Sequence, residues 1–235
     1  MQLSKRLMTV ASLVQSGGCV ADVGTDHGYI PIYLVQNGKA ASAVAMDVRP
    51  GPLERARQHV QEAGLEDRIF LRLGDGLEKL KQGEADTLVI AGMGGMLMAR
   101  ILGEYPEITG RIRELVLSPQ SDHVQVRRFL FRNGFQIAQE KMLLEDGKFY
   151  TVMRAVPGRE EMTEAGLTYG PRLLEQRDPV LAQYIRQETE KKKKVIFALE
   201  LQGTVTAQKR REELIKELEL AERAEAVLRG DTYEV

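Results

Sequence analysis

The stretch Cys19-Val-Ala-Asp-Val-Gly-Thr-Asp-His-Gly28 decides the fold of this 235-residue chain. A short apolar run carries an acid near its end, polar residues lie between two glycines, and a second apolar run follows from Ile30 to Val35. This order predicts a strand, a tight turn and the start of a helix. In a parallel α/β sheet, such a turn places a ligand over a helix N-terminus at the carboxyl edge of the sheet.

The charge of this turn limits what it can bind. Dinucleotide-binding turns need a glycine where this chain has Asp26, because bare backbone must approach a pyrophosphate. A carboxylate there repels phosphate, and Asp22 adds a second negative charge nearby. The turn therefore suits a cationic ligand rich in hydroxyl and amino groups, such as S-adenosylmethionine. The alternative is an ordinary strand–helix turn whose acids have no ligand.

Composition excludes several classes of protein. The chain is 43% hydrophobic, but its longest apolar runs are strand-sized and far shorter than the roughly 20 residues of a membrane span. A single cysteine rules out an internal disulfide, and no Cys/His cluster suggests a structural metal. The N-terminus lacks a secretory signal pattern. We therefore expect a cytoplasmic protein without membrane or metal partners, and a net charge of −1 means that RNA binding would need local patches.

Two further strands end in acids. Residues 43–48 read as a buried strand that ends near Asp47, about 20 residues beyond the first turn, where a carboxylate binds ribose hydroxyls in such folds. Residues 69–73 read as the next strand, and Asp75-Gly76 follows it at a place suited to an adenine amino group. The alternatives are a helix-capping acid at Asp47 and a plain Asp-Gly turn at Asp75.

A glycine-rich loop follows the fourth strand. Residues 85–91 are mostly apolar, as expected of a central strand covered on both faces, and Gly92-Met93-Gly94-Gly95 comes directly after them. Three glycines in four residues let backbone approach a ligand closely. The following stripe of Met96, Leu97, Ile101 and Leu102 is expected to lie in the core.

The strand–helix alternation defines the predicted domains. Residues 1–157 end in an antiparallel pair, 135–144 and 148–156, which predicts a doubly wound, mostly parallel α/β sheet with an antiparallel edge strand. In residues 158–235 the spacing of Leu181, Ile185, Val195 and Leu214 predicts two long helices in a coiled-coil-like antiparallel hairpin. Its basic runs, Lys191–Lys194 and Lys209–Arg211, form either a basic end or a solvated charged face.

Taken together, these motifs resemble those of the bacterial tRNA adenine-22 N1-methyltransferases, the TrmK family. The Asp22–Gly28 turn, the Gly92–Gly95 loop, Ser118-Pro119-Gln120 and the C-terminal hairpin carry the resemblance. It implies a class I methyltransferase fold, S-adenosylmethionine as methyl donor and N1 of an adenine in the D-arm of tRNA as acceptor. The implied cofactor-binding residues are Asp22, Gly24, Asp26, His27, Gly28, Asp47, Asp75, Gly76, Gly92 and Met93. An N-terminal amphipathic helix, residues 3–15, is expected to carry Lys5 and Arg6 on the substrate-facing rim.

Methylation of a ring nitrogen makes modest demands on side chains. N1 of neutral adenine has an in-plane lone pair, so positioning matters more than a general base. Asp26 and His27 are the weak candidates for an acid–base role, with a structural His27 as the alternative. Tyr29 is the candidate for stacking on the flipped adenine, with a core tyrosine as the alternative. The Asn/Asp-Pro-Pro-aromatic signature of exocyclic-amine methylases is replaced by the Gly92–Gly95 loop, which argues against N6 chemistry.

Other functions remain open from the sequence. The same fold could methylate another RNA, a protein or a small molecule, or serve as a non-catalytic RNA-binding protein. A nicotinamide-dependent dehydrogenase is disfavoured by Asp26. The composition is compatible with a monomer and does not select an oligomeric state.

Overall fold

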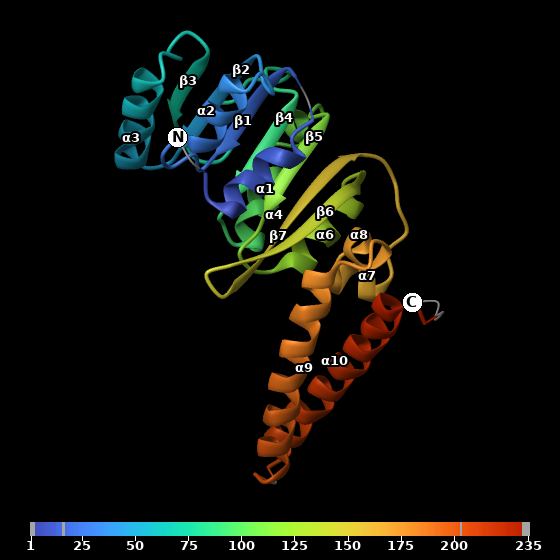
Figure 1. The fold of residues 1–235 in the computed structure, drawn as a ribbon. Helices are drawn as coiled ribbons and strands as arrows, with labels where there is room; N and C mark the ends of the chain where they lie inside the picture. The colour runs from blue at the N-terminus through green and yellow to red at the C-terminus, as the bar shows by residue number, and fades with distance from the viewer. Residues whose placement is uncertain (1–2, 16, 203, 232–235) are drawn as a thin grey trace. The chain divides into compact units, whose positions relative to one another are not determined.

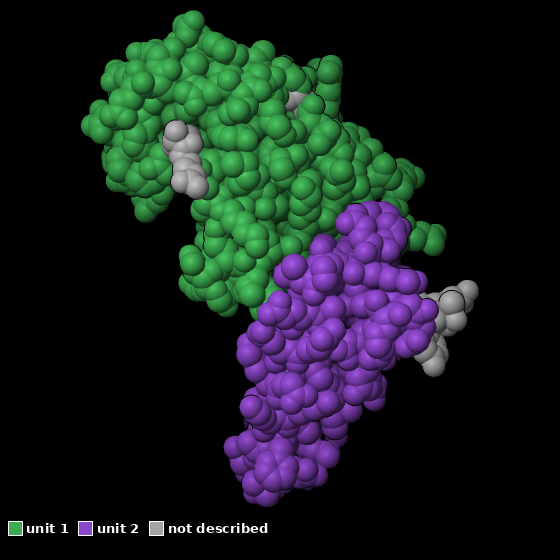
Figure 2. Space-filling model, viewed as in Figure 1, with its two compact units in different colours: residues 1–161 green, residues 162–235 purple. Residues whose placement is uncertain are grey.

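The computed structural model describes residues 3–15, 17–202 and 204–231. The chain divides into two compact units, residues 1–161 and 162–235, which Figure 2 shows in separate colours. The sequence analysis placed its boundary after residue 157, at Pro157-Gly158.

Unit 1 is built on a seven-stranded sheet with the order β3-β2-β1-β4-β5-β7-β6 (Figure 1). The strands are β1 (Cys19–Val23), β2 (Ser42–Asp47), β3 (Ile69–Leu73), β4 (Thr87–Ala91), β5 (Glu114–Ser118), β6 (Phe135–Glu145) and β7 (Lys148–Pro157). β1 to β5 are parallel, whereas β7 pairs antiparallel with both β5 and β6. The predicted doubly wound sheet is confirmed, with the antiparallel strand one place in from the edge.

Helices cover both faces of this sheet. The helices are α1 (Lys5–Leu13), α2 (Tyr29–Gln36), α3 (Pro50–Glu62), α4 (Gly95–Glu104), α5 (Pro106–Thr109) and α6 (His123–Arg132). α1, α2 and α3 pack in one apolar cluster with Val20 and Val89, and α4, α5 and α6 pack in the other with Ala21 and Leu88. Because neighbouring strand residues point to opposite faces, β1 and β4 are apolar on both sides. The loops that can face a ligand are therefore those at the strand ends.

Unit 2 consists of helices. The short α7 (Glu164–Tyr169) and α8 (Pro171–Glu175), which the sequence analysis did not predict, precede α9 (Pro179–Glu200) and α10 (Val205–Arg229). The two long helices pack against each other as the predicted antiparallel hairpin (Figure 1). Leu181, Ile185 and Leu214 are buried in it, but Val195 is 48% exposed, so its expected place in the seam was wrong.

The expected basic end of the hairpin is largely neutralised by ion pairs. Lys192 Nζ lies 2.9 Å from Glu217 Oε2, and Arg211 Nη2 lies 3.2 Å from Glu200 Oε1. Further pairs within the helices are Lys191–Glu188, Lys193–Glu190 and Arg210–Glu213. The solvated charged face, the alternative in the sequence analysis, describes most of these side chains.

Candidate functional site

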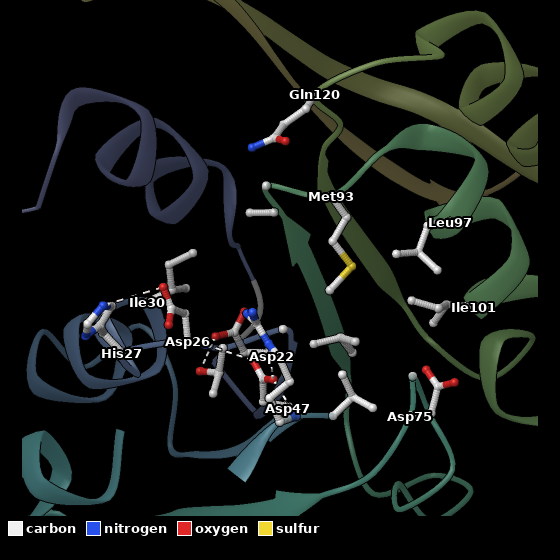
Figure 3. Close-up of a pocket in the computed structure, with 18 of the residues that line it drawn as sticks. Asp22, Asp26, His27, Ile30, Asp47, Asp75, Met93, Leu97, Ile101 and Gln120 are labelled. Atoms are coloured by element: carbon white, nitrogen blue, oxygen red, sulfur yellow. Dashed lines mark hydrogen bonds and ion pairs between the residues drawn. The ribbon is translucent and has the colours of Figure 1, made fainter. Parts of the chain in front are cut away.

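A cavity of about 740 Å³ opens at the carboxyl ends of the parallel strands (Figure 3). This is the edge where open α/β sheets bind ligands. Most residues that the sequence analysis selected line it: Arg6, Asp22, Gly24, Asp26, His27, Tyr29, Asp47, Asp75, Gly76, Gly92 and Met93. Of the selected residues, Lys5 and Gly28 are not among the described residues that line the cavity. The sequence pattern therefore locates the site well, although it does not identify the whole lining.

The turn after β1 favours glycine at its first bend. Gly24 has a φ of +73°, and its amide and that of Thr25 donate to the carbonyl of Met46 at 2.8 and 3.0 Å. A Cβ added at Gly24 would lie 2.2 Å from Met93 Cε. Gly28 acts differently, because an added Cβ there would lie 3.3 Å from the Cβ of Ala56, so the glycine lets α2 begin close against α3. The turn thus brings bare backbone to the cavity opposite the β4 loop.

Asp22 is a buried carboxylate at the end of β1. Its side chain is 3% exposed and accepts a 2.6 Å hydrogen bond from Thr25 Oγ1. Burial raises the pKa of Asp22 from 3.8 to about 6, the Thr25 hydrogen bond opposes this rise, and the nearby charge of Asp47 adds to it. A cationic group in the cavity would favour the ionised carboxylate.

Asp47 connects the loops that follow β1 and β2. Its side chain is buried, and its two oxygens accept hydrogen bonds from the amides of Arg49 at 2.9 Å and Asp26 at 3.4 Å. Arg49 Nε lies 3.8 Å from the same carboxylate. These donors fix the carboxylate at the cavity wall, where its remaining lone pairs fit a pair of vicinal hydroxyl groups.

The far side of the cavity combines an acid with apolar side chains. Asp75 lies 3.6 Å from Arg100 Nη2, and Gly76 packs on Ile101, which an added Cβ would approach to 3.1 Å. Leu97 lines the cavity and is 39% exposed, so its expected place in the core was wrong. Met96 is 60% exposed, a second correction to that stripe, whereas the remaining two positions are buried. The first turn of α4 leaves the glycine loop at the sheet edge, so Leu97 meets the cavity and Met96 meets solvent.

Asp26, His27 and Tyr29 form a polar and aromatic rim. The Asp26 carboxylate accepts from Arg55 Nη2 at 2.9 Å and lies 3.5 Å from His27 Nε2, a contact drawn in Figure 3. The Tyr29 ring packs against His27 and His59, with 5.1 Å between ring centroids in each case. His27 Nδ1 is buried without a hydrogen-bond partner among the described residues. The three side chains therefore form one cluster, in which Tyr29 is already in ring contact with His27 and His59.

Several cavity residues escaped the sequence analysis. Val48, Arg49, Leu97, Arg100 and Gln120 all line the cavity. Gln120 follows β5, and its backbone N–H donates to the backbone carbonyl of Met93 at 2.8 Å. The strand-end rule pointed to such positions, since Val48 and Arg49 directly follow Asp47, but only the acid stood out by residue type. Arg100 was hidden because a helical arginine carries no recognisable spacing.

The N-terminal helix treats its two basic side chains differently. Lys5 Nζ donates to the carbonyl of Leu144 at 3.1 Å, at the end of the β6–β7 hairpin. Arg6 instead enters the cavity, with its guanidinium carbon 5.6 Å from the centre of the Tyr150 ring. The Glu145 carboxylate accepts from the amides of both residues at 2.5 and 3.2 Å, which fixes the start of α1.

The cavity suits S-adenosylmethionine better than a dinucleotide. Asp22 and Asp47 match the charge and the ribose of that molecule, and Gly24 and Gly92 leave space next to bare backbone. Within the described ranges, no group of three or more His, Cys, Asp and Glu side chains is arranged to hold a metal ion. In the same ranges, no helix has the length and apolar character needed to cross a membrane.

Comparison with known proteins gives consistent matches. A methyltransferase-domain family model matches residues 3–153. The chain is 40% identical over 195 residues to the tRNA (adenine(22)-N(1))-methyltransferase of Bacillus subtilis, covering 80% of this chain and 82% of that protein. The crystal structure of the B. subtilis m1A22 tRNA methyltransferase TrmK superimposes with a TM-score of 0.88 at 35% identity, over 95% of this chain and 99% of that one. A Streptococcus pneumoniae protein in complex with S-adenosyl-L-methionine gives a TM-score of 0.86 at 35% identity, over 95% and 100% of the two chains.

Proposed function

Because this chain belongs to the family of tRNA (adenine(22)-N1)-methyltransferases, we propose that it transfers a methyl group from S-adenosyl-L-methionine to N1 of adenine 22 in tRNA. The observation that carries this function is the 40% identity to the B. subtilis enzyme together with an acid-lined cavity at the strand ends. Because bacterial tRNA is in the cytoplasm, the proposal includes a cytoplasmic location for the enzyme.

The strand-end acids supply the binding groups for the donor. In this proposal Asp47 accepts hydrogen bonds from the ribose hydroxyls, and Asp75 accepts one from the adenine amino group. Leu97, Ile101 and Val48 provide apolar contacts for the flat base at the same side of the cavity. Bound in this way, S-adenosylmethionine supplies an electrophilic methyl group on a positively charged sulfur.

The chain's own contribution to the reaction is chiefly geometric. Since N1 of neutral adenine has a free lone pair, no residue has to remove a proton before methyl transfer. Fixing the two reactants in line is worth as much as about 7–11 kcal/mol. Asp26 is held by Arg55 and its own backbone, with a φ of +49°, so it is a rigid part of the rim on which the target base must settle. In this proposal Asp26 faces the positive charge that develops on the methylated ring.

His27 and Tyr29 complete the proposed acceptor rim. Their stacked rings, with an interplanar angle of 11°, give an aromatic surface beside the turn that carries Asp26. Stacking on such a surface contributes about 1–3 kcal/mol per base and helps hold a base flipped from its helix. A structural role of His27 alone predicts that only stability changes in His27→Ala, whereas the rim predicts a higher KM for tRNA at unchanged stability.

The decisive experiment maps the methylated nucleotide. The purified protein is incubated with S-adenosylmethionine and either a tRNA transcript or the same transcript with guanine at position 22, and the products are digested and analysed by mass spectrometry. We expect 1-methyladenine at position 22 in the first transcript and no incorporation into the second. Equal incorporation into both would reject the site, and tRNA binding without turnover would favour a non-catalytic RNA-binding protein.

A further inference from the structure

Arg6 presents an unpartnered positive charge to the cavity. Its Nη1 atom is buried, and among the described residues it has no hydrogen-bond partner. The other two arginines that line the cavity are paired with carboxylates: Arg49 with Asp47, and Arg100 with Asp75 and Glu104. A guanidinium nitrogen that is shielded from water without an acceptor is costly, so the position of Nη1 calls for an anionic partner.

The surroundings hold Arg6 ready for such a partner. Tyr150 on β7 lies against the guanidinium, and the start of α1 is fixed by Glu145. On the cavity side the guanidinium approaches Gly92, where an added Cβ would lie 3.3 Å from Nη1. Gly92 has a φ of +82°, so both its conformation and its missing side chain keep this approach open. The side chain is therefore preorganised beside bare backbone.

The order of the strands says which part of the donor lies here. From one edge the sheet runs β3, β2, β1, β4, and the ligand-facing residues run in the same order: Asp75, Asp47, Gly24 and Gly92. In the proposed function Asp75 and Asp47 take the adenine and the ribose. The methionine part must then extend past Gly24 toward β4, where Arg6 and Gly92 meet. Its carboxylate is the one anionic group that the donor carries.

We propose that Arg6 binds the carboxylate of the methionine part of S-adenosylmethionine, an assignment that rests on the proposed function. A planar guanidinium matches a carboxylate through two parallel hydrogen bonds. A tRNA phosphate is the competing anion for Arg6, but the buried Nη1 favours a small ligand inside the cavity. Arg49, whose side chain is 71% exposed, is the better placed of the two cations for an RNA backbone.

Two ligands that differ only at the methionine part test this assignment. S-adenosylhomocysteine has the adenine, the ribose and the amino-acid carboxylate, whereas 5′-methylthioadenosine has the first two without the amino-acid group. We would measure both dissociation constants by calorimetry for wild type, Arg6→Met, Arg6→Lys and the control Lys5→Met. Lys5→Met removes the same charge from the same helix at a side chain that does not line the cavity.

The assignment makes a selective prediction. Arg6→Met should raise the dissociation constant of S-adenosylhomocysteine by about 10- to 100-fold, the usual loss for a charge-assisted pair. It should leave the dissociation constant of 5′-methylthioadenosine within about twofold of the wild-type value. Arg6→Lys should fall between wild type and Arg6→Met because it keeps the charge without the fork. Lys5→Met should bind both ligands as wild type does.

Other outcomes would overturn it. Equal losses of affinity for both ligands would mean that Arg6 supports the cavity as a whole. If Arg6→Met misfolds, the loss of affinity for S-adenosylhomocysteine relative to that for 5′-methylthioadenosine is measured for Arg6→Lys and decides the question. Unchanged binding of S-adenosylhomocysteine with a raised KM for tRNA would assign Arg6 to the RNA. Failure of the wild-type protein to bind S-adenosylhomocysteine would instead refute the proposed function itself.

Discussion

Replacing Asp22 by Asn should make the free protein more stable and the donor-binding site weaker. The carboxylate is 3% exposed, and its pKa is raised to about 6 from its ordinary value of 3.8. The native protein therefore binds more protons than the unfolded chain between those two values. Stability falls as the pH rises through this window, and it stays at the lower level above about pH 6. At neutral pH the charged Asp22 is a cost to the free protein.

The size of this cost follows from the pKa rise. At 1.36 kcal/mol per unit, a rise of about two units corresponds to at most about 3 kcal/mol. Asn has the same shape and keeps an oxygen that can accept from Thr25 Oγ1. We expect the free energy of unfolding of Asp22→Asn to exceed that of wild type by about 1–3 kcal/mol at pH 7.5. Each kcal/mol corresponds to a rise of about 2–4 °C in Tm. The difference should shrink to about a third of that size at pH 4.5, because the carboxyl of the unfolded chain is still mostly ionised there.

The assay is thermal unfolding of the ligand-free protein at the two pH values, combined with calorimetric titration of S-adenosylhomocysteine at pH 7.5. We expect the more stable variant to bind at least about tenfold more weakly, since the ligand's ammonium loses its buried counter-charge. Asp67→Asn, which removes an exposed carboxylate, is the control and should change neither quantity. The reasoning is refuted if Asp22→Asn is destabilised at pH 7.5, or if its stability difference is the same at both pH values.

Three other substitutions test separate parts of the structure. Asp47→Ala should weaken S-adenosylhomocysteine and 5′-methylthioadenosine equally, by about 10- to 100-fold in calorimetry, because both contain the ribose; a loss confined to one ligand would contradict the ribose role. Gly24→Ala forces a side chain onto Met93 at a φ of +73°. We expect this variant to lose binding of S-adenosylhomocysteine in the same titration, while about 1–2 kcal/mol of backbone strain lowers its Tm by only a few degrees. Full affinity would argue against the tight turn. Glu140→Gln removes the carboxylate that pairs with the buried charge of Arg127, and should lower the free energy of unfolding in urea by about 3–5 kcal/mol. The control Glu54→Gln, in the exposed pair with Arg57, should lower it by less than about 1 kcal/mol. Similar losses would show that burial does not govern these pairs.

The sequence predicted the site best where one rule covered several strands. Asp22, Asp47 and Asp75 lie far apart in the chain, but each follows or ends a strand of a parallel sheet. Parallel strands expose their carboxyl ends at one edge, so three local patterns became one cavity without any contact information. The glycines at 24 and 92 were recognisable for the same reason, since each stands at such an end.

Tertiary packing decided the features that local pattern missed. Leu97 belongs to an apolar helical stripe, yet the helix begins at the cavity, so this side of its first turn faces the cavity while Met98 packs in the core. Val195 fits the helical spacing but is 48% exposed near the end of α9. The sequence analysis treated Lys5 and Arg6 alike because both are basic residues of one helix. One residue of helical rotation, about 100°, nevertheless sends the two side chains in different directions.

The separation of Lys5 and Arg6 bears on how the cavity discriminates among ligands. The sequence argument rested on negative charge alone, but the lining has Asp22, Asp26, Asp47 and Asp75 facing three arginines, so net charge cannot explain the choice. What matters is which charges already have partners. Arg55 holds Asp26 and Arg100 holds Asp75, whereas Asp22 is buried beside a hydroxyl and Arg6 lacks a hydrogen-bond partner at Nη1 among the described residues. The cavity thus offers one unmatched buried anion and one unmatched cation at the β1–β4 side. A zwitterionic amino acid joined to a positive sulfur satisfies both, whereas a pyrophosphate would satisfy Arg6 and leave Asp22 facing a like charge.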